Sequence, residues 1–290
     1  MRVNKVVELL VSRQPAYFEF VDTESAGGYA GGLALAQTWA DYITYDMEHS
    51  AFDVRALTQF MRGLVDGGPT RSGHRTPAVI VTLPMDGIDA AAVRANSWMI
   101  KHVLGAGVHG LLLCHAETPE AVRSFVEAAR YAFRAGAGSD LGAGRRGHGG
   151  QLRAAEVWGI SAADYFDRAD PWPLNPKGEL LLGIKVENTR ALGCVEQTTK
   201  VPGLAFAEWG PGDMGMSMGY PDQHDEPYPA QMQAARASVM GACKSAGLAF
   251  LEQVTLQNVT SRLDAGVMLC AGLREAAEIG RKHSGRKMPW

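Results

Sequence analysis

Short apolar runs alternate along the chain with longer segments in which apolar residues recur every three or four positions. The longer segments, such as VRALTQFMRGLVDG and PEAVRSFVEAARYAF, have the spacing of amphipathic helices. Strands that alternate with helices form parallel β/α units, so eight of them predict a (β/α)8 barrel, with an open doubly wound sheet as the alternative. The predicted strands cover residues 16–22, 42–47, 78–83, 110–116, 180–187, 203–209, 249–254 and 267–272.

One segment, residues 136–176, interrupts this alternation after the fourth predicted strand. It contains the glycine-rich stretch GAGSDLGAGRRGHGG, a short helical piece and the stretch DPWPLNP. Long loops in compact domains are usually functional, and barrel active sites lie at the carboxyl ends of the strands. We therefore predict one barrel domain over residues 1–290, in which 136–176 forms a rim or lid. A disordered glycine-rich insertion is the alternative.

Composition limits the kinds of partner. The chain has 46% hydrophobic and 20% charged residues with a net charge of −3. Its charges are mixed in sign, without a basic stripe for nucleic acid, and no apolar run approaches the roughly 18 residues that span a membrane. The cysteines lack C-x-x-C spacing, which is typical of reduced residues in a cytoplasmic protein. We expect a small-molecule ligand.

Charged side chains gather where three of the predicted strands end. Alternate residues of a strand share a face, so Lys185 and Glu187 should point into the barrel, and the same alternation turns Asp46 inward. Glu187 ends the fifth strand and Asp213 follows the sixth. Two carboxylates on neighbouring strand ends form an oxygen-rich site suited to Mg²⁺ or Mn²⁺.

These residues also have structural alternatives. Glu187 and Lys185 could form only a buried ion pair, and Asp213 in its Gly-Pro-Gly turn could be a turn former. His49 could be a satisfied histidine at the rim. For Glu48, a structural salt bridge or a cap is expected in preference to chemistry.

Three motifs occur in order at these strand ends. They are D-x-E-H at 46–49, E-N at 187–188 and G-P-x-D-x-x-x-S-x-G-Y-P at 210–221. Together they resemble the HpcH/HpaI aldolase/citrate lyase family of metal-dependent pyruvate-type aldolases, which includes macrophomate synthase. The resemblance implies a (β/α)8 barrel that assembles as a homo-oligomer, a trimer or hexamer with its last helix exchanged between subunits.

The resemblance also implies a reaction, in which a 4-hydroxy-2-oxo acid is cleaved to, or formed from, a 2-oxo acid and an aldehyde through a metal-bound pyruvate enolate. Glu187 and Asp213 would hold the divalent metal, Mg²⁺, Mn²⁺ or Co²⁺. His49, oriented by Asp46, would act as general base. Backbone amides at Gly212 and Asp213 would contact the substrate carboxylate.

The sequence departs from the family pattern at two positions that bear on the substrate. The third strand offers Thr82 where the family commonly has an arginine, and Lys185 stands where a glutamine is usual. We predict that Lys185 supplies the cationic contact of the missing arginine. An aromatic substrate partner would suit Tyr165, Phe166, Trp172 and Trp209.

Several functions remain open from the sequence. The first is a metal-dependent carbon–carbon lyase, a class II aldolase, in which oxaloacetate decarboxylation could use the same enolate. The second is a Schiff-base aldolase, because an amine desolvated inside a barrel, here Lys185, can attack a ketone. The third is a non-catalytic binding barrel.

Overall fold

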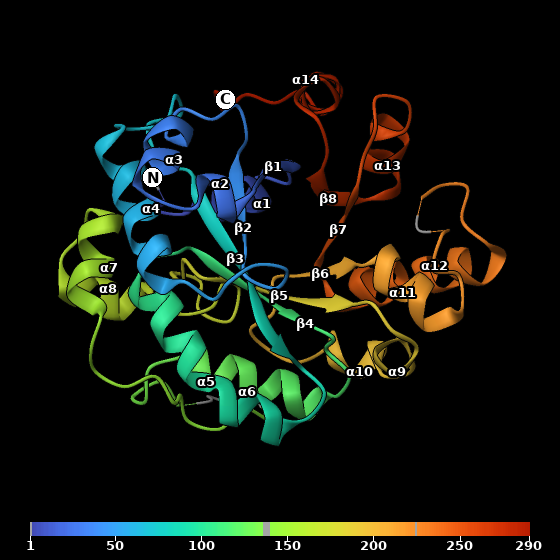
Figure 1. Cartoon of the computed structure of the whole chain (residues 1–290), viewed down its shortest axis with the longest axis horizontal. Coiled ribbons are helices and arrows are strands. Elements are labelled where there is room, and N and C mark those ends of the chain that lie inside the picture. Colours follow the sequence, from blue (N-terminus) through green and yellow to red (C-terminus); the bar gives the residue numbers. More distant parts are fainter. Residues whose placement is uncertain (1, 136–139, 224) are drawn as a thin grey trace.

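A computed structural model describes residues 2–135, 140–223 and 225–290, and within them eight parallel strands close into a barrel in chain order (Figure 1). All eight predicted strands are present, so the prediction of a (β/α)8 barrel is confirmed. The strands are β1 (Ala16–Val21), β2 (Tyr42–Asp46), β3 (Ala78–Asp86), β4 (Gly110–Cys114), β5 (Leu181–Val186), β6 (Phe206–Trp209), β7 (Ala249–Gln253) and β8 (Val267–Ala271).

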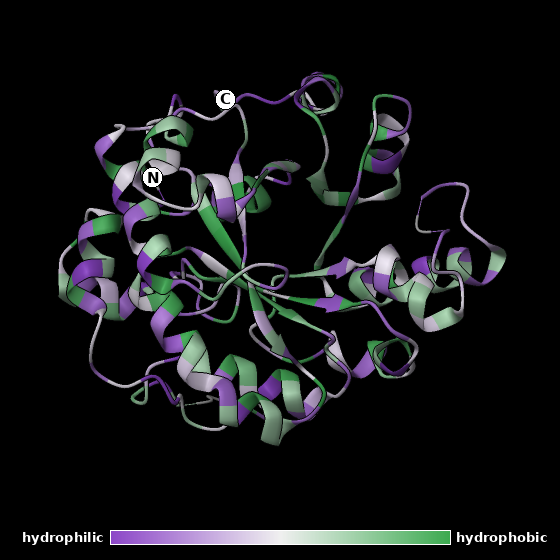
Figure 2. Cartoon of the chain, viewed as in Figure 1, coloured by the Kyte–Doolittle hydropathy of each residue, from purple (hydrophilic) through white to green (hydrophobic). Residues whose placement is uncertain are grey.

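Helices cover the outside of the barrel. The strands at its centre are mainly hydrophobic, whereas the helices carry both hydrophobic and hydrophilic residues (Figure 2). No helix within the described ranges combines the length and the hydropathy that a membrane span requires. The helices are α1 (Lys5–Val11), α2 (Thr23–Ala26), α3 (Tyr29–Leu35), α4 (Val54–Asp66), α5 (Ala90–Gly105), α6 (Pro119–Ala129), α7 (Gln151–Trp158), α8 (Ala162–Arg168), α9 (Thr189–Gly193), α10 (Val195–Thr198), α11 (Pro211–Met218), α12 (Ala230–Ala246), α13 (Val259–Ala265) and α14 (Arg274–His283).

Large apolar side chains fill the barrel interior toward the amino ends of the strands. Phe206 covers Gly183 on the neighbouring strand, where an added Cβ would lie 2.2 Å from the Phe206 ring. This filling gives the polar residues at the carboxyl ends a closed apolar floor. The floor includes Tyr42, Ile80, Leu112, Leu181, Phe206, Leu251 and Leu269.

The described part of the predicted lid lies at the other end of the barrel. Residues 140–176 follow α6, which returns the chain to the amino ends of the strands. The Trp158 indole donates a hydrogen bond of 2.9 Å to the carbonyl of Gly107, just before β4, and stacks on His109 with ring centroids 5.7 Å apart. The prediction of a lid over the carboxyl ends is therefore wrong for this part, and 136–139 lie outside the described residues.

The aromatic residues of this segment also lie away from the predicted site at the carboxyl ends of the strands. Tyr165 is buried against Trp158, with ring centroids 4.7 Å apart, and Trp172 packs against the apolar floor. Phe166 contacts Tyr131 at 4.9 Å between centroids. These three residues therefore do not form an aromatic substrate pocket at the carboxyl ends.

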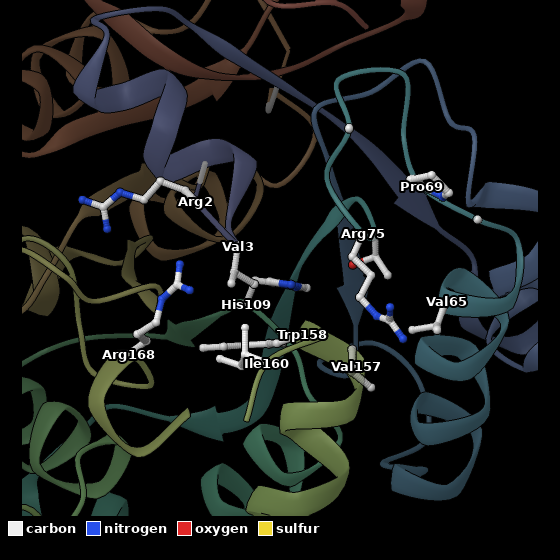
Figure 3. A pocket seen from close by; sticks show the side chains of 14 residues that line it. Arg2, Val3, Val65, Pro69, Arg75, His109, Val157, Trp158, Ile160 and Arg168 are labelled. Carbon is white, nitrogen blue, oxygen red and sulfur yellow. The ribbon is translucent and has the colours of Figure 1, made fainter. Parts of the chain in front are cut away.

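A cavity of about 450 Å³ lies between this segment and the amino ends of the strands (Figure 3). Trp158 forms part of its wall, and Arg2, Arg75 and Arg168 line it. The Arg2 and Arg168 guanidinium groups lie on one side, where both pair with Glu179, while Arg75 points to the other side (Figure 3). The positive charges do not converge on one point, so this cavity is not a strong candidate for an anion site.

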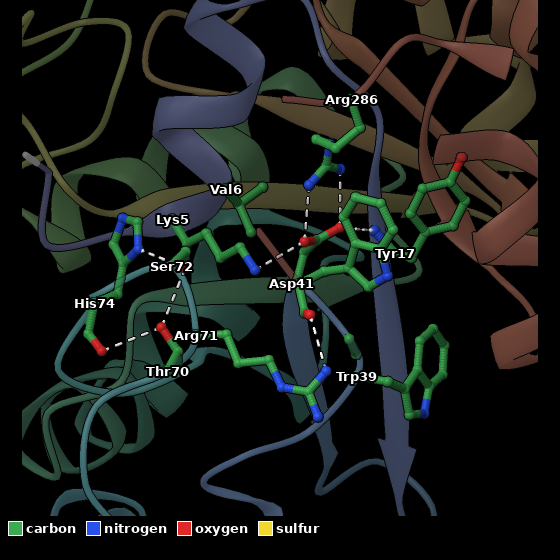
Figure 4. Close-up of polar contacts among 12 residues, drawn as sticks. Lys5, Val6, Tyr17, Trp39, Asp41, Thr70, Arg71, Ser72, His74 and Arg286 are labelled. Atoms are coloured by element: carbon green, nitrogen blue, oxygen red, sulfur yellow. Dashed lines mark hydrogen bonds and ion pairs between the residues drawn. The ribbon is translucent and has the colours of Figure 1, made fainter. Parts of the chain in front are cut away.

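A buried ionic cluster ties the two ends of the chain to β2 (Figure 4). The Asp41 carboxylate is fully buried and lies 3.0 Å from Lys5 Nζ, 3.2 Å from Arg281 Nη2 and 3.0 Å from Arg286 Nη2. Burial would raise the pKa of Asp41, but Lys5, Arg286 and Arg281 outweigh it and hold the pKa well below its usual range. One carboxylate thus compensates three buried cations.

Candidate active site

Acidic side chains from three strand ends meet at the carboxyl mouth of the barrel. Within the described residues, ligand atoms of Glu48, His115 and Asp213 lie within 4.8 Å of one another, as do those of Glu48, Cys114 and Glu187. Glu48 belongs to both groups, so it is close to each of the two predicted metal ligands. The structure therefore brings Glu187 and Asp213 to one site, together with a third carboxylate.

Glu187 is rigidly placed. Its side chain is 1% exposed, and its Oε1 atom accepts a hydrogen bond of 2.8 Å from the backbone amide of His115. Gly210 on the neighbouring strand end leaves room for it, since a Cβ there would lie 2.7 Å from Glu187 Cβ. His115 has a φ of 45°, a conformation that non-glycine residues rarely adopt, and this aims its amide at the carboxylate.

The site holds more negative than positive charge. Burial raises the pKa of Glu187 and Glu48 adds to this, although Lys185 and the His115 amide oppose the shift. Carboxylates that burial makes hard to ionise gain most from a nearby cation, and carboxylate oxygens are the ligands that Mg²⁺ and Mn²⁺ prefer. The residues present thus fit a divalent metal.

Lys185 points into the barrel, as predicted, and forms ion pairs with two acids. Its ammonium contacts Glu48 and lies 3.7 Å from Glu187 Oε2. Burial would lower the pKa of Lys185, but Glu208, Cys114, Glu187 and Glu48 together raise it above its usual value. The side chain is therefore a protonated cation. The salt bridge expected for Glu48 is present, and it faces the barrel interior, because Glu48 lies two residues after Asp46 and shares its inward face.

His49 and Asp46 form a hydrogen-bonded pair at the mouth. His49 Nδ1 lies 2.8 Å from Asp46 Oδ2, and Asp46 also accepts the backbone amide of Glu48 at 2.8 Å. The His49 side chain is 67% exposed and its pKa is raised, chiefly by the hydrogen bond to Asp46. With its Nδ1 proton donated to Asp46, a neutral His49 presents Nε2 as the free base.

Two connected cavities adjoin these groups. An inner chamber of about 260 Å³ reaches down to the apolar floor, and a mouth cavity of about 1090 Å³ opens above it. Thr82 lines the inner chamber, while Gly212 and Asp213 line the mouth cavity in the first turn of α11. Residues that line both are Phe18, Phe20, His49, Lys185, Glu208 and Leu251.

Trp209, predicted to contact substrate, faces mainly away from these groups. It pairs in register with Val186, and both residues belong to the core between the barrel and the helices. Its ring is 2% exposed and lies edge-on to Tyr228 at 6.1 Å. Trp209 lines only the wall of the mouth cavity. The alternation of β6 that buries Trp209 turns its neighbour inward.

That neighbour, Glu208, was missed by the sequence analysis. It pairs in register with Lys185 on β5, and burial raises its pKa to about 7. The signal was present in the run GLAFAEWG, where Phe206 and Glu208 share the inward face. His115 was also given no role, although its position just after β4 placed it at the mouth.

Comparison with known proteins identifies the family. The family model of HpcH/HpaI aldolase/citrate lyase matches residues 82–265. The chain belongs to this family. The family is one of aldolases and lyases, and a hydroxypyruvate/pyruvate aldolase from Paraburkholderia phytofirmans is 28% identical over 225 residues, which cover 78% of this chain and 74% of that protein. This HpcH/HpaI protein is thus a carbon–carbon lyase of the aldolase type.

Solved structures of the HpcH/HpaI family agree with the fold. A family protein from Burkholderia cenocepacia superposes with a TM-score of 0.72 at 23% identity over 97% of both chains. Macrophomate synthase superposes with a TM-score of 0.64 at 18% identity, over 98% of this chain and 86% of that one. At these identities the likeness concerns the barrel alone.

Proposed function

We propose that this protein is a metal-dependent class II aldolase that cleaves or forms a 4-hydroxy-2-oxo acid, with a 2-oxo acid and an aldehyde as the smaller partners. The observation that carries the proposal is that Glu48 lies close to both Glu187 and Asp213, beside the His49–Asp46 pair. An acidic metal site next to an oriented base suits a metal-dependent retro-aldol cleavage. The relatives named hydroxypyruvate/pyruvate aldolase support the 2-oxo acid.

Glu187 and Asp213 are the proposed metal ligands, for Mg²⁺, Mn²⁺ or Co²⁺. A divalent cation bound there would supply Lewis-acid stabilisation of the negative charge that develops on the substrate during carbon–carbon cleavage. Glu187 is held for this role by the His115 amide. Glu48 keeps Lys185 beside the same carboxylates through its ion pair.

The substrate carboxylate is proposed to bind at the beginning of α11. Gly212 and Asp213 lie in its first turn, after the N-cap Gly210, where backbone amides have no partner within the helix. An anion at a helix N-terminus is stabilised by these amides and by the helix dipole. Thr82, with its hydroxyl on the wall of the inner chamber, offers a further polar contact.

His49 is the proposed general base. Asp46 holds the imidazole by the 2.8 Å contact to Nδ1, so that Nε2 can take the proton of the substrate 4-hydroxyl as the carbon–carbon bond breaks. In the reverse direction the same atom returns the proton to the oxygen of the aldehyde. The exposure of His49 at the mouth leaves room for a water molecule in this transfer.

Lys185 is proposed to act as a fixed cation that compensates for the missing arginine. Its ion pairs with Glu48 and Glu187 favour the ammonium form, which has no lone pair to attack a ketone. This environment disfavours the Schiff-base mechanism.

Activity with pyruvate or hydroxypyruvate and a panel of aliphatic and aromatic aldehydes should therefore be lost on treatment with EDTA and restored by Mn²⁺. Borohydride with substrate should leave no covalent adduct on Lys185; an adduct found by mass spectrometry would reject the metal mechanism.

The pH profile of the reaction should respond to Asp46. The hydrogen bond to Asp46 raises the pKa of His49 above the usual histidine value. At pH values below this raised pKa, His49 is protonated and cannot act as the base. In Asp46→Asn this pKa falls, so the acid limb of the kcat/KM profile should move to lower pH while the maximal rate drops about 10- to 100-fold. An acid limb at the same pH in both proteins would argue against His49 as the base.

The family likeness also supports a homo-oligomer, a trimer or hexamer. Sedimentation equilibrium of the purified chain at several concentrations tests this directly. A monomer at micromolar concentration would contradict it.

A further inference from the structure

Glu208 lies at the junction between the two cavities of the site. Its position in β6, in register with Lys185, turns its carboxyl group into the barrel, and it lines both the inner chamber and the mouth cavity. His49, the proposed base, also lines both cavities. A substrate that extends from the proposed metal ligands toward His49 therefore passes Glu208.

Among the described residues, the Glu208 carboxyl group shares with Asp213 the lack of a hydrogen-bond or ion-pair partner, whereas three other acids of the site have one. Asp46 contacts His49, Glu48 contacts Lys185, and Glu187 accepts the His115 amide. Among the residues that the structure describes, Glu208 has charged neighbours but forms no hydrogen bond or ion pair. The side chain is half-buried on the wall of both cavities, so its carboxyl group is accessible there to a ligand.

The surroundings of Glu208 favour a small hydroxyl-bearing ligand. Phe18, Phe206 and Leu251 form apolar walls of the inner chamber, and Thr82 lines the same chamber from β3. A hydroxyl group both donates and accepts hydrogen bonds, so it pairs with a carboxyl group in either protonation state. A methyl group in the same place would leave Glu208 unpaired.

We infer that Glu208 hydrogen-bonds a hydroxyl group on C3 of the 2-oxo acid and so selects 3-hydroxy donors of the hydroxypyruvate type over pyruvate. The inference rests on the proposed function. A 2-oxo acid held through its carboxylate and 2-oxo group beside Glu187 and Asp213 has C3 as its remaining carbon. C3 is also the carbon that forms the bond to the aldehyde, so it faces the passage that His49 and Glu208 line.

The test compares Glu208→Leu and Glu208→Gln with the wild-type protein, all loaded with Mn²⁺. The measured quantity is the ratio of kcat/KM for hydroxypyruvate to that for pyruvate with one aldehyde. Glu208→Leu should lower this ratio about 10- to 100-fold, since a buried hydroxyl group without a partner carries a penalty of that size. Glu208→Gln keeps a donor and an acceptor, so it should retain most of the preference.

Calorimetry provides a second readout that does not depend on turnover. The ratio of the Kd values of hydroxypyruvate and pyruvate should change in the same direction, while the Kd of Mn²⁺ alone stays near the wild-type value because Glu208 is not a proposed ligand. Glu196→Leu is the matched control, since Glu196 is exposed on α10, outside both cavities, and should leave both ratios unchanged.

The possible results separate the two proposals. If the wild-type protein neither binds nor converts either 2-oxo acid with Mn²⁺, the proposed function fails and the inference fails with it. If the wild-type protein is active but Glu208→Leu keeps the wild-type ratios, only the inference is overturned. If Glu208→Gln lowers the hydroxypyruvate-to-pyruvate ratio as much as Glu208→Leu does, Glu208 acts through its charge. That result would also overturn the inference.

Discussion

Replacing Glu187 by glutamine should remove both divalent-metal binding and aldolase activity. The Glu187 carboxylate accepts a hydrogen bond of 2.8 Å from the His115 amide and occupies the space beside Gly210. No other carboxylate can therefore take its position as a ligand. Lewis-acid stabilisation contributes several kcal/mol to such reactions, and we expect kcat/KM to fall about 10³-fold or more. Calorimetric titration with Mn²⁺ should show the loss of binding directly.

The fold should survive the Glu187→Gln substitution, because burial already raises the pKa of this carboxyl group and the amide has nearly the same shape. Glu127→Gln is a suitable control: Glu127 is also buried, but it pairs with Arg145 at 3.2 Å, at the opposite end of the barrel from the mouth. It should leave Mn²⁺ affinity unchanged. If Glu187→Gln binds Mn²⁺ with the wild-type affinity, Glu187 is not a metal ligand.

Replacing Asp41 by asparagine should destabilise the protein strongly. The substitution leaves Lys5, Arg281 and Arg286 buried together without a compensating charge. Removing one partner from a buried ionic cluster costs about 3–5 kcal/mol in the free energy of unfolding. Thermal and urea unfolding measure this loss. Asp66→Asn is the control, since Asp66 pairs with Arg62 at the surface and should change stability by no more than about 0.5 kcal/mol.

The same cluster predicts a pH dependence. Because the pKa of Asp41 is lowered in the folded state, its contribution is complete above the unfolded pKa of about 4 and is lost as the pH falls toward the folded value. The stability difference between the wild-type protein and Asp41→Asn should therefore narrow below about pH 4. Equal stability of the two proteins at pH 7 would show that the cluster contributes nothing.

Much of the architecture could be predicted because it depends on local pattern. Each strand is a short apolar run bounded by turn residues, and the period of two places Lys185 and Asp46 inside the barrel without any tertiary information. The same rule holds for Glu208, which was overlooked only because no motif drew attention to it. The rule also covers Glu48, which lies two residues after Asp46 on the same inward face, but only the structure shows that its partner is Lys185.

The position of the insertion, residues 140–176, could not be predicted from local pattern. Nothing in residues 140–176 indicates which end of the barrel they occupy, because that depends on where α6 ends and on the contact of Trp158 with Gly107 and His109. Those partners are about 50 residues away in the chain, and packing of this kind leaves no periodic signal. The predicted lid therefore proved to be a structure at the amino ends of the strands.

The sequence by itself determined the barrel, the family and the residues at the ends of β2, β5 and β6, because hydrophobic period and short motifs are local properties of the chain. The tertiary structure decided which charges meet. Glu48, Glu187 and Asp213 come from different strand ends, Lys185 receives its partner from β2, and the three cations around Asp41 come from the two ends of the chain. Such contacts depend on the closure of the barrel, since Coulomb interactions act through space and not along the sequence.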